Sequence, residues 1–378
     1  MDNRENTPIY FINDLQDDSE RSSTYATTSS GLTEYTMSTL TSDAASEYFQ
    51  EFYGRMFPVD ENVPFLFPTD DAELRRLKLQ HLSLKLVFGS NYFGPVRNVL
   101  SEVLSERRKR VLDLFTADGT WVREMAAEFP HVDFTSVDIV PLVPHPRSAN
   151  ILGYEVYDVY NGIAEASDSF DIIHLRYSMS KVNSTSSRLA LLITPLELGA
   201  LQIRQLPSLI RELHRVLRPG GLFLYGEYEN EVFDGSTDNH EASNTAPYMV
   251  HASRLSREAF DRQGVHAYAF KDVPRLLDPE CSLWSGDMQR KGFVNMIRDE
   301  KIVPAGQWPQ VTHLREVGLI TQYVWCEMWK SLRPLFINHG VSSAEANELV
   351  NGAITELMDP GSRQLYAKYH VLYAFKPM

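Results

Sequence analysis

The stretch that decides the fold is "RVLDLFTADGTWV", residues 110–122. Its apolar run around Asp113 is typical of a buried strand, and the residues from Thr120 onward predict a helix. A strand, a tight turn and a helix in this order form the ligand-binding unit of open parallel sheets, and the turn usually carries several glycines. Here the turn contains one glycine, Gly119. The stretch alone therefore does not decide whether a cofactor binds.

Beyond this unit the chain alternates between predicted strands and helices. The further strand candidates are "DFTSVDI" (133–139), "GYEVYDV" (153–159), "FDIIHLR" (170–176), "GGLFLYGEY" (220–228) and "YHVLYAFKP" (369–377). Strands that alternate with helices imply a parallel sheet covered on both faces. We therefore predict an α/β fold of the Rossmann-like type, with a doubly wound, mostly parallel sheet, an N-terminal helical preamble and an inserted cap.

The chain divides into a tail and one large domain. The first 50 residues carry nine acids and two bases, with serine and threonine crowded between Ser22 and Ser42, so we expect residues 1–45 to be a disordered tail. A solvated extension is favoured over a regulatory, phosphorylated tail, although the tail remains a candidate for binding protein partners. The expected parts of the domain, residues 46–378, are a helical preamble (46–110), a Rossmann-like core (111–228), a cap insertion (229–319), and helices with a closing strand (320–378).

Composition restricts the partners. The formal net charge is −14, from 50 acids and 36 bases, which argues against a nucleic-acid or anionic-membrane surface. The most apolar stretch, residues 189–201, includes Pro195 and Glu197 and is too short to cross a bilayer. The two cysteines, Cys281 and Cys326, have no metal-ligand spacing, so no metal is expected. The first residues lack the features of a signal peptide. We expect a cytoplasmic protein, with a nuclear location left open, whose partner is a small molecule or a protein.

Acids follow the second and third predicted strands. Asp138 stands where a carboxylate can accept hydrogen bonds from both ribose hydroxyls of an adenosine. Asp158 stands where a carboxylate can accept one from the exocyclic amine of an adenine. Isolated aspartates at strand ends more often serve turns, but in this order along the chain we favour ligand contact.

The order of these motifs carries a resemblance. The acid-ended first strand, the acids after strands two and three, "SFDII" (169–173) and "LRPGG" (217–221) together resemble the class I S-adenosylmethionine-dependent methyltransferases. The segments "ELRRL" (73–77) and "PAGQWP" (304–309) are more specific and look like the fungal LaeA-like methyltransferases. The similarity extends from about residue 47 to the C-terminus.

The resemblance implies a site for S-adenosylmethionine. Its residues would be the loop positions Asp113, Phe115, Ala117 and Gly119, the ribose ligand Asp138, the adenine neighbours Asp158 and Val159, and Arg176 with Tyr177 at the mouth. In the family pattern D-x-G-x-G-x-G, Phe115 replaces the first glycine and Ala117 the second. If φ at Phe115 is positive, the backbone is strained by about 1 kcal/mol or more. If φ is ordinary there, the ring turns into the sheet or lies beside the methionine moiety of the cofactor.

The resemblance implies an enzyme that methylates a small secondary metabolite, with oxygen as the expected acceptor atom. The alternatives are a LaeA-like regulator that acts through protein complexes, and a pseudoenzyme with impaired cofactor binding. The sequence does not assign a catalytic residue, and the candidate bases are Tyr177, Lys181, Glu227 and a cap histidine. His174 is expected to be a hydrogen-bonded core histidine, and Trp325 with Trp329 a helix packing face. For Glu227 and Glu229, a substrate-facing position and a solvated strand end have equal weight.

Overall fold

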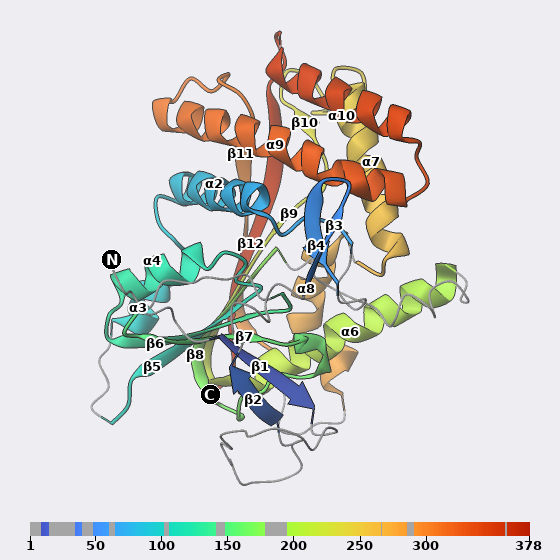
Figure 1. The fold of residues 1–378 in the computed structure, drawn as a ribbon. Coiled ribbons are helices and arrows are strands. Elements are labelled where there is room, and N and C mark those ends of the chain that lie inside the picture. The colour runs from blue at the N-terminus through green and yellow to red at the C-terminus, as the bar shows by residue number, and fades with distance from the viewer. Residues whose placement is uncertain are drawn as a thin grey trace, which may run out of the picture.

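A ten-stranded sheet forms the centre of the protein (Figure 1). The computed structural model describes residues 9–14, 35–39, 48–59, 65–101, 106–140, 148–177, 195–265, 267–285, 291–359 and 361–378. The strands of the sheet are β1 (Ile9–Asp14), β2 (Tyr35–Thr39), β5 (Lys109–Leu114), β6 (Val132–Asp138), β7 (Ile151–Val156), β8 (Phe170–Arg176), β9 (Leu217–Tyr228), β10 (Phe233–Asp234), β11 (Val294–Pro304) and β12 (Leu365–Phe375). Their order is β10-β12-β9-β8-β5-β6-β7-β1-β2, and β11 also pairs with β12.

The core of the sheet is parallel, as predicted. Strands β7, β6, β5, β8 and β9 are parallel neighbours, and β12 closes the series as an antiparallel strand beside β9. The central strand β5 is an apolar run because both of its faces are covered, and Val111, Leu112 and Leu114 are fully buried. The chain places β6 and β7 on one side of β5, then β8 and β9 on the other. This reversal puts the ligand-binding edge at the carboxyl ends of β5 and β8.

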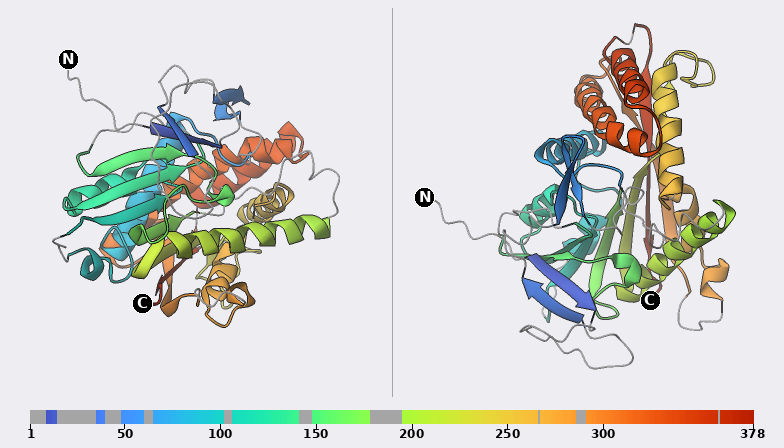
Figure 2. Two further views of the ribbon diagram at one scale, coloured as in Figure 1. Left: turned by 90° about the horizontal axis from the view of Figure 1, so that it is seen from below. Right: turned by 45° about the vertical axis from the view of Figure 1, so that its right-hand side comes forward.

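Helices cover both faces of the sheet and gather at one end. They are α2 (Asp71–Phe88), α3 (Val96–Leu100), α4 (Thr120–Glu128), α6 (Pro195–Val216), α7 (Pro247–Arg262), α8 (Ala269–Leu277), α9 (Thr312–Asn338) and α10 (Ser343–Met358). Helix α4 packs on β6 and β7, whereas α6 and α8 pack on β9. Helices α7, α9 and α10 form a layer at one end of the molecule, and α2 lies between this layer and the sheet (Figures 1 and 2).

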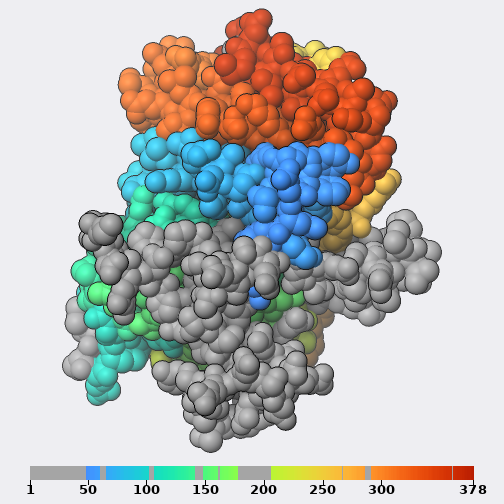
Figure 3. Space-filling view, viewed as in Figure 1, coloured from blue at the N-terminus to red at the C-terminus, as the bar shows by residue number. Residues whose placement is uncertain are grey.

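The helical preamble expected over residues 46–110 contains α2, whose ends follow from its sequence, but its first part is a β-hairpin and not a helix. The Asp70 side chain accepts the Glu73 backbone N–H at 3.1 Å and caps the first turn, and Gly89, at φ +69°, ends the helix in a left-handed conformation. Before α2 in the chain, β3 (Phe49–Phe52) and β4 (Arg55–Pro58) form a hairpin. In the space-filling view this hairpin and α2 form a band beneath α9 and α10 (Figure 3).

Two parts of the chain differ from expectation. Within the segment expected to be a disordered tail, β1 adds to the sheet edge beside β7 and β2 pairs with β1. Within the expected cap, β11 is a strand of the main sheet, and α8 covers a sheet face. One face of β11 is exposed, so its sequence contains several charged residues and does not have the apolar run of a buried strand. The division of the chain into domains therefore stays a prediction.

Among the described residues, no helix has the length and apolarity that a membrane span requires.

Candidate functional site

The loop between β5 and α4 has the backbone of a glycine-rich turn without most of its glycines. Phe115, Ala117 and Gly119 have φ of +57°, +52° and +69°. These are the three positions at which the family pattern D-x-G-x-G-x-G places glycine. The conditional expectation of strain at Phe115 is therefore met, at about 1 kcal/mol or more for each non-glycine residue. The chain keeps the conformation of the loop although two glycines are replaced.

The Phe115 ring turns into the protein. It is 5% exposed, belongs to the apolar cluster between the sheet and α6, and stacks on Tyr160 with ring centroids 6.4 Å apart. It also borders the large cavity described below. The packing of a buried aromatic ring offsets part of the backbone strain.

Gly119 is the position of the loop where a side chain fits least. A Cβ atom there would lie 2.8 Å from the Tyr154 hydroxyl oxygen and 3.2 Å from Arg123 Nη1. The next residue, Thr120, begins α4, so the N-terminus of this helix faces the loop. Close approach of polar groups to a bare backbone is a feature of cofactor loops.

Asp138, at the end of β6, supports the loop from below. Its Oδ2 accepts the Ala117 N–H at 2.8 Å, and its Oδ1 accepts the Val140 N–H at 3.3 Å. The carboxylate is 4% exposed. The ribose role stays a prediction.

Asp158 also has a structural bond. Its Oδ1 accepts the Tyr160 N–H at 2.9 Å and caps the short 3-10 helix η1 (Val159–Asn161). Val159 is 2% exposed. Their contact with an adenine stays a prediction.

One carboxylate oxygen of Asp113 contacts a histidine, and the other has no hydrogen-bond partner in the described part of the chain. Its Oδ1 lies 2.7 Å from Nδ1 of His174, and the buried Oδ2 has no hydrogen-bond partner among the described residues. Asp113 is 2% exposed, so the open oxygen lacks compensation from bulk water. A bound ammonium group would supply the missing donor. The loop therefore fits the methionine end of S-adenosylmethionine.

His174 is buried, as expected for a core histidine, but its partners belong to the site. Its ring stacks on Trp121, with centroids 3.7 Å apart and planes 16° apart. Burial is the main cause that lowers the pKa of His174, against the opposing effect of Asp113. The imidazole is therefore neutral around pH 7.

Arg176 is the last residue of β8 and Tyr177 follows it; Tyr177 borders the large cavity described below, whereas Arg176 borders a separate small hollow. Arg176 Nη1 donates to Nδ1 of His81 at 2.9 Å, and its guanidinium lies 5.2 Å from the centroid of the Tyr177 ring. Burial, with a contribution from Arg176, lowers the pKa of His81 to about 4. Tyr177 has φ +57°, a second strained position at the same sheet edge.

A cavity of about 190 Å³ connects this loop to the helical layer. Its lower wall includes Phe115, Ala117 and Tyr177, together with Glu227 near the end of β9. The upper wall comes from α2, α7 and α9. Its apolar side chains are Leu74, Leu77, Phe260, Val324, Trp325, Met328, Trp329 and Leu332, and its polar side chains are Glu73, Arg76, Gln80, Ser83, Ser253 and Thr321. The cavity therefore borders the predicted cofactor loop.

Glu227 lines the cavity. Trp325 and Trp329 line the cavity and also pack in the hydrophobic core. Glu227 is 1% exposed, so the solvated strand end is excluded for this residue. Trp325 and Trp329 are buried in the cluster with α7 and α10, as a packing face should be, and they also line the cavity. One candidate base from the sequence, Lys181, lies outside the described residues.

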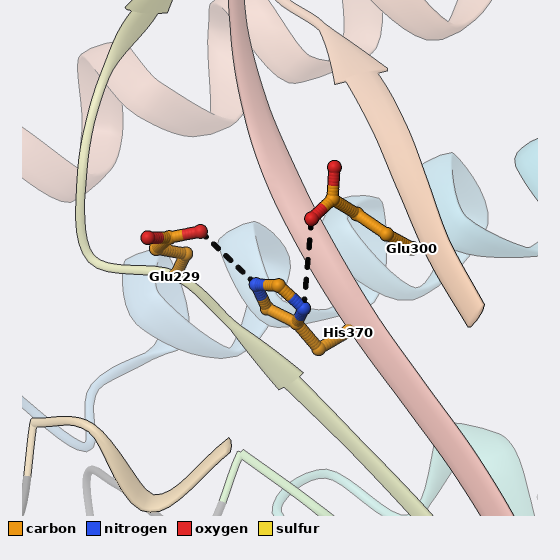
Figure 4. A group of neighbouring side chains, drawn as sticks. All are labelled: Glu229, Glu300 and His370. Atoms are coloured by element: carbon orange, nitrogen blue, oxygen red, sulfur yellow. Dashed lines mark hydrogen bonds and ion pairs between the residues drawn. The ribbon is translucent and has the colours of Figure 1, made fainter. Parts of the chain in front are cut away.

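A group of Glu229, Glu300 and His370 is close enough to be considered for a metal (Figure 4). His370 Nε2 lies 3.0 Å from Glu229 Oε2, and Nδ1 lies 3.8 Å from Glu300 Oε2. The imidazole thus stands between the two carboxylates, and Lys368 adds a cation 3.4 Å from Glu300. The hydrogen bond from His370 lowers the pKa of Glu229. With both ring nitrogens engaged, the group is explained as an ion-pair cluster.

Sequence reasoning missed the contacts of His174, Trp121 and His81. Asp113 and His174 are register partners on neighbouring strands β5 and β8. A parallel pairing of the "VLDL" and "IIHL" runs would have brought them together, but the register was not available from the sequence.

Comparison with known proteins agrees with this geometry. A family model described as a methyltransferase domain matches residues 88–274. A secondary metabolism regulator laeA of Coprinopsis cinerea is 28% identical over 83% of this chain and 71% of its own length. That of Aspergillus flavus is 23% identical over 71% of this chain, and a protein-methionine methyltransferase laeA of Emericella nidulans is 24% identical over 71%. The chain spans 62% and 61% of the length of the last two relatives.

Among solved structures, a phosphoethanolamine N-methyltransferase 2 of Haemonchus contortus in complex with S-adenosyl-L-methionine matches with a TM-score of 0.39. The sequences are 14% identical, and the match covers 91% of this chain and 63% of that chain.

Proposed function

We propose that this chain is a member of the LaeA-like group of class I S-adenosylmethionine-dependent methyltransferases, to which its family-model match and its relatives point, and that it methylates a small, largely apolar secondary metabolite at an oxygen atom. The observation that carries the proposal is the continuity of the cavity with the loop. Phe115 and Ala117 belong to the cofactor loop and also form part of the cavity wall. An acceptor in this cavity would lie next to the methyl donor, shielded from water.

The cavity chemistry supports an apolar acceptor with a polar end. The side chains from α7 and α9 are mostly aromatic or aliphatic, whereas Tyr177 and Glu227, together with Glu73, Arg76 and Gln80 of α2, supply polar groups. Pockets of this kind bind small molecules through apolar walls and orient them through a few polar groups.

Asp113 and Asp138 would hold S-adenosylmethionine through its ammonium and its ribose hydroxyls. When bound, the cofactor supplies a methyl group already activated by a sulfonium. Two buried acids border the cavity, and Glu73 is ion-paired with Arg76, so we assign Glu227 to accept the proton of an acceptor hydroxyl. Transfer would join the acceptor oxygen to the methyl carbon and leave the electron pair of the broken bond on sulfur, while Glu227 would hold the released proton.

Calorimetric titration of the full chain with S-adenosylmethionine and S-adenosylhomocysteine tests the first part of the proposal. We expect saturable binding of both ligands, and absence of detectable binding would reject the enzyme. Incubation with labelled S-adenosylmethionine and a metabolite extract would then test the acceptor, with Glu227→Gln as the variant and Glu300→Gln, at an exposed acid outside the cavity, as its matched control. Label in small organic products, lost in Glu227→Gln alone, is the expected result.

A second candidate is methylation of a protein, in a regulator that works within a complex. The names of the relatives from Coprinopsis cinerea and Emericella nidulans favour it, and so does Met328, a thioether that lines the same cavity. Intact mass measurement after incubation with S-adenosylmethionine separates the two candidates. A gain of one methyl group that disappears in Met328→Leu would support a protein acceptor, and an unchanged mass would exclude methylation of this chain itself.

A further inference from the structure

His174 lies beside the acid of the cofactor loop, on the neighbouring strand. Asp113 and His174 are register partners of β5 and β8, and the contact between Oδ1 and Nδ1 is 2.7 Å. A carboxylate accepts hydrogen bonds and does not donate them, so Nδ1 carries the hydrogen. The contact therefore fixes both the rotation of the carboxylate and the tautomer of the imidazole.

The imidazole itself is held by packing. The Trp121 indole stacks on it at 3.7 Å and is 1% exposed, and Trp121 Nε1 donates to the Asn91 carbonyl at 2.7 Å. Trp121 is the second residue of α4, which follows the cofactor loop. Strand β8, the start of α4 and the segment after α2 thus restrain one ring.

The contact leaves the other oxygen of Asp113 for a ligand. That oxygen is buried and has no hydrogen-bond partner among the described residues. His174 is neutral because burial lowers its pKa, so the imidazole orients the carboxylate without cancelling its charge. The other charged groups near His174 are Arg176 on its own strand and His81 with Lys85 on α2, which border the same small hollow.

We propose that His174 is a positioning residue for the cofactor, which aims the free oxygen of Asp113 at the ammonium group of the methionine end. The inference rests on the proposed function, because it assumes that S-adenosylmethionine binds at this loop. It goes further in assigning the orientation of the loop acid to a side chain of the neighbouring strand.

The test compares two ligands that differ only in the part His174 is proposed to affect. S-adenosylhomocysteine has the amino-acid end, whereas 5′-methylthioadenosine shares the adenosine and sulfur but lacks it. The full chain is titrated with both by calorimetry, as wild type and as His174→Phe, which keeps a flat ring for Trp121 but removes the donor. We expect about tenfold weaker binding of S-adenosylhomocysteine, from the loss of one hydrogen bond to a charged group, and 5′-methylthioadenosine within about twofold of wild type.

Two further variants separate positioning from packing. His174→Asn retains an N–H donor and should restore part of the affinity for S-adenosylhomocysteine. Asp113→Asn should show the same selective loss, and His174→Phe added to it should cost little more, because both substitutions act on one interaction. Should His174→Phe fail to fold, Trp121→Phe, which loosens the stack, should give a smaller loss of the same selectivity.

The outcomes are distinct. An equal loss for both ligands, or no loss for S-adenosylhomocysteine, would overturn the inference and leave His174 as a packing residue. A wild-type chain that binds neither ligand would instead reject the proposed function on which the inference rests. Selective loss in His174→Phe, or in Trp121→Phe where only that variant folds, supports it.

Discussion

Asp113 and Asp138 lie near the ends of neighbouring strands, and they differ in what their oxygens bond. Both are buried, at 2% and 4% exposure. The two oxygens of Asp138 accept backbone N–H groups of Ala117 and Val140, whereas Asp113 has one oxygen bound by His174 and one without a hydrogen-bond partner among the described residues. Asp138 therefore holds the loop through backbone N–H groups, whereas Asp113 keeps the oxygen that we propose as the ammonium ligand.

The difference explains how the loop keeps its conformation without its glycines. Phe115 and Ala117 are held at positive φ, at a cost of about 1 kcal/mol or more each. The hydrogen bond from Ala117 to Asp138 holds the second position, and burial of the Phe115 ring stabilises the first. In the family pattern, glycine permits positive φ at these positions. Here the hydrogen bond to Asp138 and the packing of the Phe115 ring stabilise the same conformation.

The largest effect should come from Asp138→Ala, which removes loop support and the predicted ribose ligand together. Two buried N–H groups lose their acceptor, so we expect the free energy of unfolding to fall by about 1–3 kcal/mol. Affinity for S-adenosylhomocysteine should fall by about 100-fold or more, since about two or three hydrogen bonds are lost or misplaced. Chemical denaturation and calorimetric titration measure the two quantities.

Asp113→Asn is the matched control for this prediction. Its amide oxygen still accepts from His174, so stability should change by less than about 1 kcal/mol, while affinity falls because the ammonium loses its charged partner. Unchanged affinity in Asp138→Ala would refute the ribose assignment. Equal loss of stability in both variants would remove the distinction between the two acids.

The second effect is the difference in stability between two variants of Phe115, and it measures the backbone strain at this residue. Phe115→Ala removes a buried ring and should destabilise the fold by about 3 kcal/mol. Phe115→Gly removes the same ring but tolerates φ +57°, so it should be more stable than Phe115→Ala by about 1 kcal/mol. This reverses the usual advantage of alanine over glycine. Urea denaturation of the two variants decides it, and equal stability would mean that the loop relaxes when the ring is lost.

The sequence predicted what depends on local pattern and order. The parallel core, the strands around Asp113 and Asp138 and the helix after Gly119 follow from apolar runs and turn residues. The pairing of Asp113 with His174 and the cavity between α2 and α9 depend on strand register and on contacts between distant segments. Strand β11 was missed for a related reason, because an edge strand with one exposed face has no continuous apolar run. The sequence predicted strain at Phe115 only if φ there is positive. It did not predict the sign of φ, because the conformation of the whole loop sets it.

The smallest predicted effect is the pH dependence of stability that His81 causes, on the side of the site where Asp113 lies. His81 accepts a hydrogen bond from Arg176, and burial lowers the pKa of His81 to about 4 from an ordinary value of 6.5. The unfolded chain therefore takes up a proton at higher pH than the folded chain does. The stability from neutral His81 is fully present above about pH 6.5 and is lost as the pH falls toward about 4.

Between pH 7.5 and 5.5 we expect the wild-type chain to lose about 1 kcal/mol more stability than His81→Gln. Glutamine accepts from Arg176 through its carbonyl and donates through its amide, but it does not titrate. Denaturation curves of both proteins at the two pH values give the difference, to which His174 contributes equally in each. Parallel loss in both would show that His81 is not the group that titrates. Because protonated His81 would repel Arg176, the extra loss would make the Asp113 side, and not the Asp138 side, the pH-sensitive half of the site.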